Sequence, residues 1–219
     1  MESTDLIKDG FIDLGDSSMG SHFREFEQKN FPFRTEEGID FLSQHFLNNE
    51  EIRSLIGQFF GNNRCVFAHC LRYSSSPGHL GCFVRGNVGQ SVLVVQLLSK
   101  GSELEYYSYS HTNPRAGSST KMSGMATIGV DKNELDLKGC RARKKEFDTG
   151  ALVVFDGRLC VEFKQGFAIN VVFVTEDIVS RYHMPPMRLP YHLKAKVEDL
   201  QRRYPDIKLN FDFEPGTLQ

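Results

Sequence analysis

Residues 149–163 read TGALVVFDGRLCVEF, two apolar segments on either side of a tight Asp156-Gly157-Arg158 link. Aliphatic, β-branched and aromatic side chains fill both segments, which is typical of buried strands. Aspartate and glycine favour turns, because an Asp side chain can accept hydrogen bonds from the backbone just beyond it and glycine tolerates unusual φ angles. The stretch therefore predicts two strands joined by a tight link. For Asp156 and Arg158 two readings remain open, a turn held by a local salt bridge or an arginine that reaches a substrate carboxylate.

The same strand pattern extends on both sides of these two strands, from residue 64 to residue 175. Short β-branched or aromatic segments follow one another at roughly 10–12-residue spacing, with Gly, Ser, Asn and Pro between them and no helix, which predicts a sandwich or a jelly roll. SVLVVQLL (91–98) is apolar on both faces and is expected to be a central strand. Residues 107–124 contain a Gly- and Ser-rich loop, which we expect to cover a barrel mouth.

Helical patterns flank the strands. In residues 48–61, apolar side chains recur at the spacing of one helix face, with an asparagine before them and Gly61 after them as caps. Residues 35–47 predict another short helix, and a charged helix is expected over 191–205. We predict a single domain over 1–219, in which 1–63 form a helical cap with a first strand, 64–175 the jelly-roll core, and 176–219 a linker and C-terminal helix.

Composition narrows the function classes. The 219 residues are 40% hydrophobic with a net charge of −2, so no general nucleic-acid or membrane surface is implied. No apolar segment is long enough to cross a membrane, and the acidic N-terminus lacks an apolar signal core. The five cysteines contain no CxxC pair and are expected to be reduced core thiols. These features predict a cytoplasmic protein. A homodimer is a further possibility, since the C-terminal helix is charged and residues 208–213 can form an edge strand.

Three stretches in order carry a resemblance to a known family: IKDGFIDLG (7–15), LLSKGSELEYYSYSHT (97–112) and TGALVVFDGRLCVEF. Their order and spacing resemble the phytanoyl-CoA dioxygenase-like branch of the Fe(II)/2-oxoglutarate oxygenases. The resemblance spans roughly residues 5–175. It implies a mainly β double-stranded β-helix, a cupin-like jelly roll with flanking helices.

The resemblance also implies a 2-His-1-carboxylate iron triad, which this chain does not supply. The His-x-Asp element falls on His79-Leu80-Gly81, where glycine offers no carboxylate. The second histidine falls on Val161, and the basic residue expected for the 2-oxoglutarate carboxylate falls among apolar residues near Asn170. The metal site is therefore expected to be degenerate, with His79 the one residue that could still bind a metal. No cofactor is expected, and Fe(II) and 2-oxoglutarate enter only if the chain is an atypical dioxygenase.

Other polar residues remain candidates for a ligand pocket. His79, His69 and Tyr73 are the expected acid/base groups, although a buried, hydrogen-bonded core histidine is the simpler interpretation of His69. The expected substrate contacts are Tyr107, Tyr109, His111, Arg158 and Arg115. For the tyrosines and His111, ordinary packing is the alternative to a pocket contact. The strand register leaves open whether Val161 or Glu162 faces the cavity, because a slip of one residue exchanges the two.

The leading hypothesis is an oxygenase-like jelly roll without the standard iron triad. It would bind a small apolar metabolite, or transform it by isomerisation or cyclisation through shape and acid/base contacts. An atypical Fe(II)/2-oxoglutarate dioxygenase is the second hypothesis. The third is a non-catalytic interaction protein. The expected partner is a small molecule, not nucleic acid or a membrane.

Overall fold

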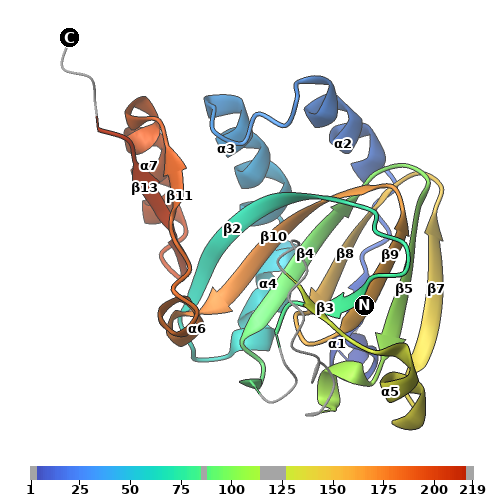
Figure 1. Ribbon diagram of the computed structural model, residues 1–219. Helices are drawn as coiled ribbons and strands as arrows, with labels where there is room; N and C mark the ends of the chain where they lie inside the picture. Colours follow the sequence, from blue (N-terminus) through green and yellow to red (C-terminus); the bar gives the residue numbers. More distant parts are fainter. Residues whose placement is uncertain (1–3, 85–87, 114–126, 216–219) are drawn as a thin grey trace.

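The computed structural model describes residues 4–84, 88–113 and 127–215 (Figure 1). Within them, two mainly antiparallel sheets pack face to face as a jelly roll. The larger sheet runs in the order β1 (Phe11–Asp13), β8 (Ala151–Asp156), β4 (Val92–Leu98), β10 (Phe167–Thr175), β2 (Cys65–Ser74) and β12 (Ile207–Leu209). The smaller sheet runs β6 (Ile128–Gly129), β3 (Leu80–Cys82), β9 (Cys160–Gln165), β5 (Ser102–Ser108) and β7 (Arg141–Phe147). The predicted double-stranded β-helix is confirmed.

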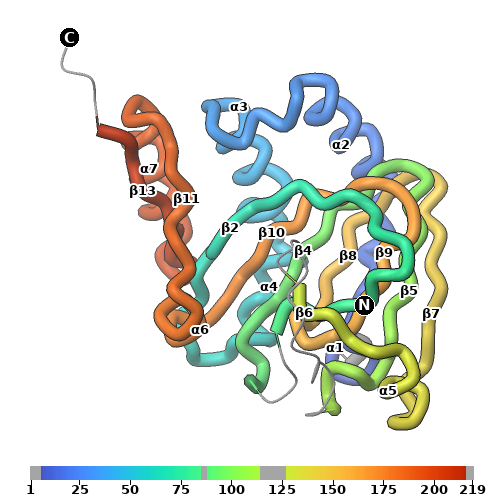
Figure 2. The backbone as a smooth tube through the Cα atoms, in the orientation of Figure 1, coloured from blue at the N-terminus to red at the C-terminus, as the bar shows by residue number. Residues whose placement is uncertain are grey.

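Helices cover the outer face of the larger sheet, as the backbone trace in Figure 2 also shows. The helical elements are α1 (Thr4–Asp9), α2 (Met19–Gln28), α3 (Glu36–Leu42), which continues as a π-helix (Ser43–Leu47), α4 (Glu50–Phe60), α5 (Lys132–Leu137), α6 (Glu176–Arg181) and α7 (Lys194–Arg203), with 3₁₀ turns at Ser110–Thr112 and Tyr191–Leu193. Among the described residues, no helix combines the length and apolar character needed to span a membrane.

The α4 helix has the expected caps. Asn49 accepts hydrogen bonds from the backbone N–H groups of Glu51 and Ile52, and Gly61 follows the last turn with φ 57°. The apolar stripe of α4 packs on alternate residues of β4, such as Leu93 and Val95. The remaining β4 side chains point into the barrel. Every residue of β4 is therefore buried, as expected for a central strand.

One edge of the barrel is closed where β1 meets β7. The rings of Phe11 and Tyr106 stack there with centroids 4.4 Å apart. Lys145 of β7 lies 4.0 Å from Asp13, and its Nζ is 6.0 Å from the Phe11 ring centroid. Because β7 pairs with β5 alone among the described strands, its exposed basic residues form a solvated edge strand.

The C-terminal segment folds beside the helices. Its β11 (Met187–Leu189) and β13 (Phe211–Phe213) pair in parallel, and the apolar residues of α7 pack against Ile39 of α3. The predicted edge strand is confirmed, since β12 adds in parallel to β2. All five cysteines are buried and none forms a disulfide, which agrees with the expected core thiols.

One expectation about the helical layer is wrong. The sequence places His22, His45, His183 and His192 in helical or linker segments, which predicts surface positions, but His45 is only 8% exposed. It lies in the π-helix, where its ring contacts the rings of His22 and Phe41 with centroids 4.4 and 4.6 Å away. Burial lowers the pKa of His45 to about 4, and the nearby His22 adds to that shift. The aromatic cluster between α2 and α3 therefore includes a buried histidine.

Candidate functional site

A small cavity lies inside the barrel, on the side opposite the β1–β7 edge. Its volume is about 40 Å³. In the same measure a water molecule needs about 10–15 Å³, so the space corresponds to on the order of three waters. The described residues that line it come from both sheets: Tyr73, Ser74, Ser76, His79, Gly81, Phe83, Gln96, Thr127, Phe155, Val161, Phe163 and Asn170.

The cavity is built around the pairing of β3 with β9. Gly81 is the register partner of Val161, and His79 lies just before β3. All three residues line the cavity. The structure thus brings together the three positions on which the iron ligands of the resembled family fall.

These residues do not fit an iron ion. Neither Gly81 nor Val161 has a metal-donor atom, and a Cβ added at Gly81 would lie 3.0 Å from the Ile128 carbonyl oxygen and 3.2 Å from His79 Nε2. Among the described residues, no group of three or more His, Cys, Asp or Glu side chains is arranged to hold a metal. Of these residue types, Glu2 and Asp5 have side chains that the structure does not describe. One imidazole is far short of the facial triad.

His79 has a partner of its own. Its Nε2 lies 3.1 Å from the hydroxyl oxygen of Thr127, in a hydrogen bond across the cavity wall. A ligand that reaches His79 would meet this imidazole–hydroxyl pair together.

The register of β9 resolves the choice between Val161 and Glu162. Val161 packs with the inner core of the barrel. Glu162 points outward, where its Oε1 accepts a hydrogen bond of 2.9 Å from the backbone N–H of Gly78. No carboxylate enters the cavity from this strand.

Two carboxamides at the base of the cavity were not among the sequence candidates. Gln96 of β4 and Asn170 of β10 are direct cross-strand partners, 3% and 1% exposed. Gln96 Oε1 accepts a hydrogen bond of 3.1 Å from the hydroxyl of Tyr106. The signal was present in the sequence, since Gln96 is the single polar residue of β4, and Asn170 is the single polar residue of β10 apart from its last residue, Thr175.

His69 and Tyr73 of β2 also point into the barrel. Their partners on β10 are Val172 and Ala168, which both belong to the inner core. Tyr73 lines the cavity, whereas His69 lies further along the strand and does not. Burial lowers the pKa of His69, and its Nε2 is enclosed without a hydrogen-bond partner among the described residues.

Tyr107 and Tyr109 lie away from the cavity. Tyr107 is buried on the outer face of the smaller sheet, beneath α5, and its hydroxyl donates to Glu105 Oε2 at 3.2 Å. Burial and that glutamate raise its pKa. Tyr109 follows the end of β5 with φ 70° and is 39% exposed. Tyr106 points into the barrel instead, because side chains alternate between the two faces of a strand.

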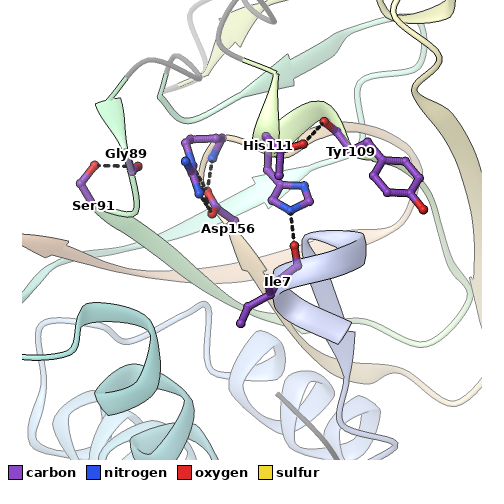
Figure 3. Close-up of polar contacts among 8 residues, drawn as sticks. Ile7, Gly89, Ser91, Tyr109, His111 and Asp156 are labelled. Atoms are coloured by element: carbon purple, nitrogen blue, oxygen red, sulfur yellow. Dashed lines mark hydrogen bonds and ion pairs between the residues drawn. The ribbon is translucent and has the colours of Figure 1, made fainter. Parts of the chain in front are cut away.

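His111 and Arg158 make structural contacts, and Figure 3 shows that of His111 with Ile7. The His111 Nε2 lies 2.9 Å from the carbonyl oxygen of Ile7, and a carbonyl can only accept, so His111 donates this bond to α1. Arg158 is held by Asp156 through several hydrogen bonds, with its side chain 12% exposed. This is the arrangement expected for a turn held by a local salt bridge. The structure brings neither residue to the cavity, and Arg115 lies outside the described residues.

Comparison with known proteins supports the fold. No protein-family model matches the chain, and no curated protein is similar to it in sequence. Among solved structures, the epimerase SnoN in complex with Fe3+, alpha ketoglutarate and nogalamycin RO aligns with a TM-score of 0.55 at 10% identity, over 79% of this chain and 82% of SnoN. EctD from S. alaskensis, with 2-oxoglutarate and 5-hydroxyectoine, aligns with a TM-score of 0.52 at 10% identity, over 80% of this chain and 75% of EctD. The chain therefore shares the jelly-roll fold of iron/2-oxoglutarate enzymes.

Proposed function

We propose that this protein binds a small molecule in the barrel cavity without iron, with His79 as the main polar contact. The observation that carries the proposal is the place of the cavity: it lies at the Gly81–Val161 pair, beside His79, where neither Gly81 nor Val161 has a metal-donor side chain. Apolar walls with a few convergent polar groups are typical of ligand sites. We also propose that the chain derives from the phytanoyl-CoA dioxygenase-like branch.

The volume limits what enters the barrel. Pockets for drug-sized ligands are roughly 300–1,000 Å³, whereas this cavity has about 40 Å³. The inserted part is therefore a group of a few non-hydrogen atoms, and the apolar remainder of the metabolite lies at the mouth. Isomerisation or cyclisation suits such a site, since both are redox-neutral and need only a proton taken from one atom and returned to another. His79 and Tyr73 are the groups proposed to handle that proton.

The test is a fragment screen followed by NMR of the histidine ring signals. We expect saturable shifts of the His79 signals and none of His192, which is exposed. The variant His79→Ala should abolish the binding of the same fragments. If no fragment perturbs His79 or the other cavity residues, the proposal fails.

Iron and 2-oxoglutarate are tested in parallel. The donor set predicts no stoichiometric iron in protein purified without chelator, and no change of Tm on adding both. Stoichiometric iron lost in His79→Ala would favour the atypical dioxygenase instead.

A second candidate function is a non-catalytic interaction protein. It is favoured by a larger cleft of about 700 Å³ between the C-terminal ends of α4 and α7, which includes Arg53, Tyr204 and Lys208. Under this function, His79→Ala would leave partner binding intact and Tyr204→Ala would weaken it.

A further inference from the structure

The carboxamide pair at the base of the cavity has an unusual position. Gln96 and Asn170 face each other on β4 and β10, two central strands of the larger sheet, and both line the cavity. Their neighbours along each strand are fully buried apolar residues. Buried amides at such positions are normally fully hydrogen-bonded.

The two amides differ in their hydrogen bonds. The Gln96 carbonyl oxygen is occupied by the Tyr106 hydroxyl. The Asn170 Oδ1 is enclosed and has no hydrogen-bond partner among the described residues. Leaving a buried acceptor unpaired costs about 1–3 kcal/mol, so a donor from a bound molecule would recover that free energy.

The described residues of the cavity lining include one histidine, His79, and otherwise only uncharged residue types. Among the described residues that form it there is no Asp, Glu, Lys or Arg. Transfer of an isolated carboxylate into such surroundings is strongly unfavourable. A dicarboxylate such as 2-oxoglutarate, present in the SnoN and EctD structures, is therefore a poor match to this lining.

We propose that the group inserted into the cavity is an uncharged amide, whose N–H donates to Asn170 Oδ1 and whose carbonyl accepts from the neighbouring donors. This inference rests on the proposed small-molecule site and names the class of its ligand. An amide carries a donor and an acceptor side by side, as a carboxamide does, so the two groups can pair through both hydrogen bonds. The pairing holds for either orientation of the Asn170 side-chain amide.

Three probes of nearly the same size and shape test the proposal: acetamide, acetate and acetone. Each is titrated into ¹⁵N-labelled protein while the side-chain amide signals of Gln96 and Asn170 are followed by NMR. We expect saturable shifts with acetamide and at least ~10-fold weaker binding of acetate and acetone, a difference of about 1.4 kcal/mol.

Variants assign the effect to Asn170. Asn170→Leu has a similar shape without hydrogen-bonding groups and should abolish the acetamide response. Gln58→Leu, which removes an exposed carboxamide from α4, should leave it unchanged. If Asn170→Leu does not fold, Asn170→Ala serves in its place, because it also removes the Oδ1 acceptor.

The outcomes separate this inference from the proposed function. Acetate or acetone binding as tightly as acetamide overturns the amide assignment and leaves the small-molecule site standing. Tight acetate binding that is lost in the variant Arg115→Ala would also overturn the amide assignment. No response of the cavity signals to any of the three, together with a negative fragment screen, overturns both.

Discussion

Two buried polar pairs in this barrel have opposite hydrogen-bonding states. At the corner between β8 and β9, Asp156 accepts from the backbone N–H and the guanidinium of Arg158, with the shortest contact 2.5 Å. At the base of the cavity, Asn170 faces Gln96 and its Oδ1 has no partner among the described residues. Asp156 and Asn170 are each 1% exposed.

This difference in hydrogen bonding bears on which buried polar side chains stabilise the fold. Asp156 is saturated, and its contacts are all within the turn that joins the two sheets. Asn170 carries an unpaired acceptor, which no folding requirement explains. The proposal for Asn170 is therefore that its unpaired acceptor serves a ligand, whereas the contacts of Asp156 serve the turn.

The largest expected effect comes from breaking the saturated pair. Asp156→Ala leaves the largely buried Arg158 guanidinium without its anion, and breaking a buried pair in this way costs about 3–5 kcal/mol. Urea unfolding measures the loss. The matched control is Glu198→Ala, which breaks an exposed pair with Lys194 and should cost under about 1 kcal/mol. A similar small loss for Asp156→Ala would mean that saturation does not mark structural importance.

The second prediction extends the comparison to a buried titratable group. The pKa of His45 is about 4 in the folded protein against 6.5 unfolded, so the unfolded state binds more protons between these values. Stability is therefore present above pH 6.5 and lost as pH falls towards 4. The free energy of unfolding should fall by on the order of 2 kcal/mol, because solvent screening reduces the effect of the full pKa shift.

The measurement is urea unfolding at several pH values between 7 and about 4. His45→Phe should keep the ring contact with Phe41 and flatten the pH dependence in this window, whereas His192→Gln, an exposed change, should not. An unchanged pH profile in His45→Phe would show that the acid sensitivity originates elsewhere.

Much of the architecture follows from local sequence patterns. The strands, the α4 caps and the Asp156–Arg158 turn are each encoded by residues adjacent in sequence, through side-chain alternation, capping and turn chemistry. The position of Val161 was predictable from the order of motifs, but its direction was not, because one slip of register would have exchanged it with Glu162. The structure settles that register through the pairing of Gly81 with Val161.

The cavity itself was harder to predict, because it depends on residues far apart in the chain. Thr127 meets His79 across 48 positions, and Gln96 meets Asn170 across two central strands. The misplacement of His45 has the same origin. A polar residue in a predicted helix is expected at the surface, whereas the rings of His22 and Phe41 enclose His45 only after α2 and α3 pack.

The third prediction reverses the sign of the first. Asn170→Leu removes an unpaired buried amide and keeps the shape of the side chain, so it should stabilise the ligand-free protein by about 1 kcal/mol. Urea unfolding with and without acetamide measures this. The stabilisation by acetamide seen in the wild type should vanish in the variant. A destabilised Asn170→Leu would indicate that Asn170 is part of the structural network, like Asp156.

The smallest effect is expected for an ion pair at the surface of the barrel. Asp13 and Lys145 form an ion pair like that of Asp156 and Arg158, but they are 4.0 Å apart and their side chains are 30% and 41% exposed. Exposed pairs contribute about 0.2–1 kcal/mol and are screened by salt. Lys145→Ala should therefore cost under about 1 kcal/mol, and the cost should shrink further at 1 M salt in the same urea assay. A loss as large as that of Asp156→Ala would show that the β1–β7 edge holds the barrel closed through its charges, and not through the stacked rings of Phe11 and Tyr106.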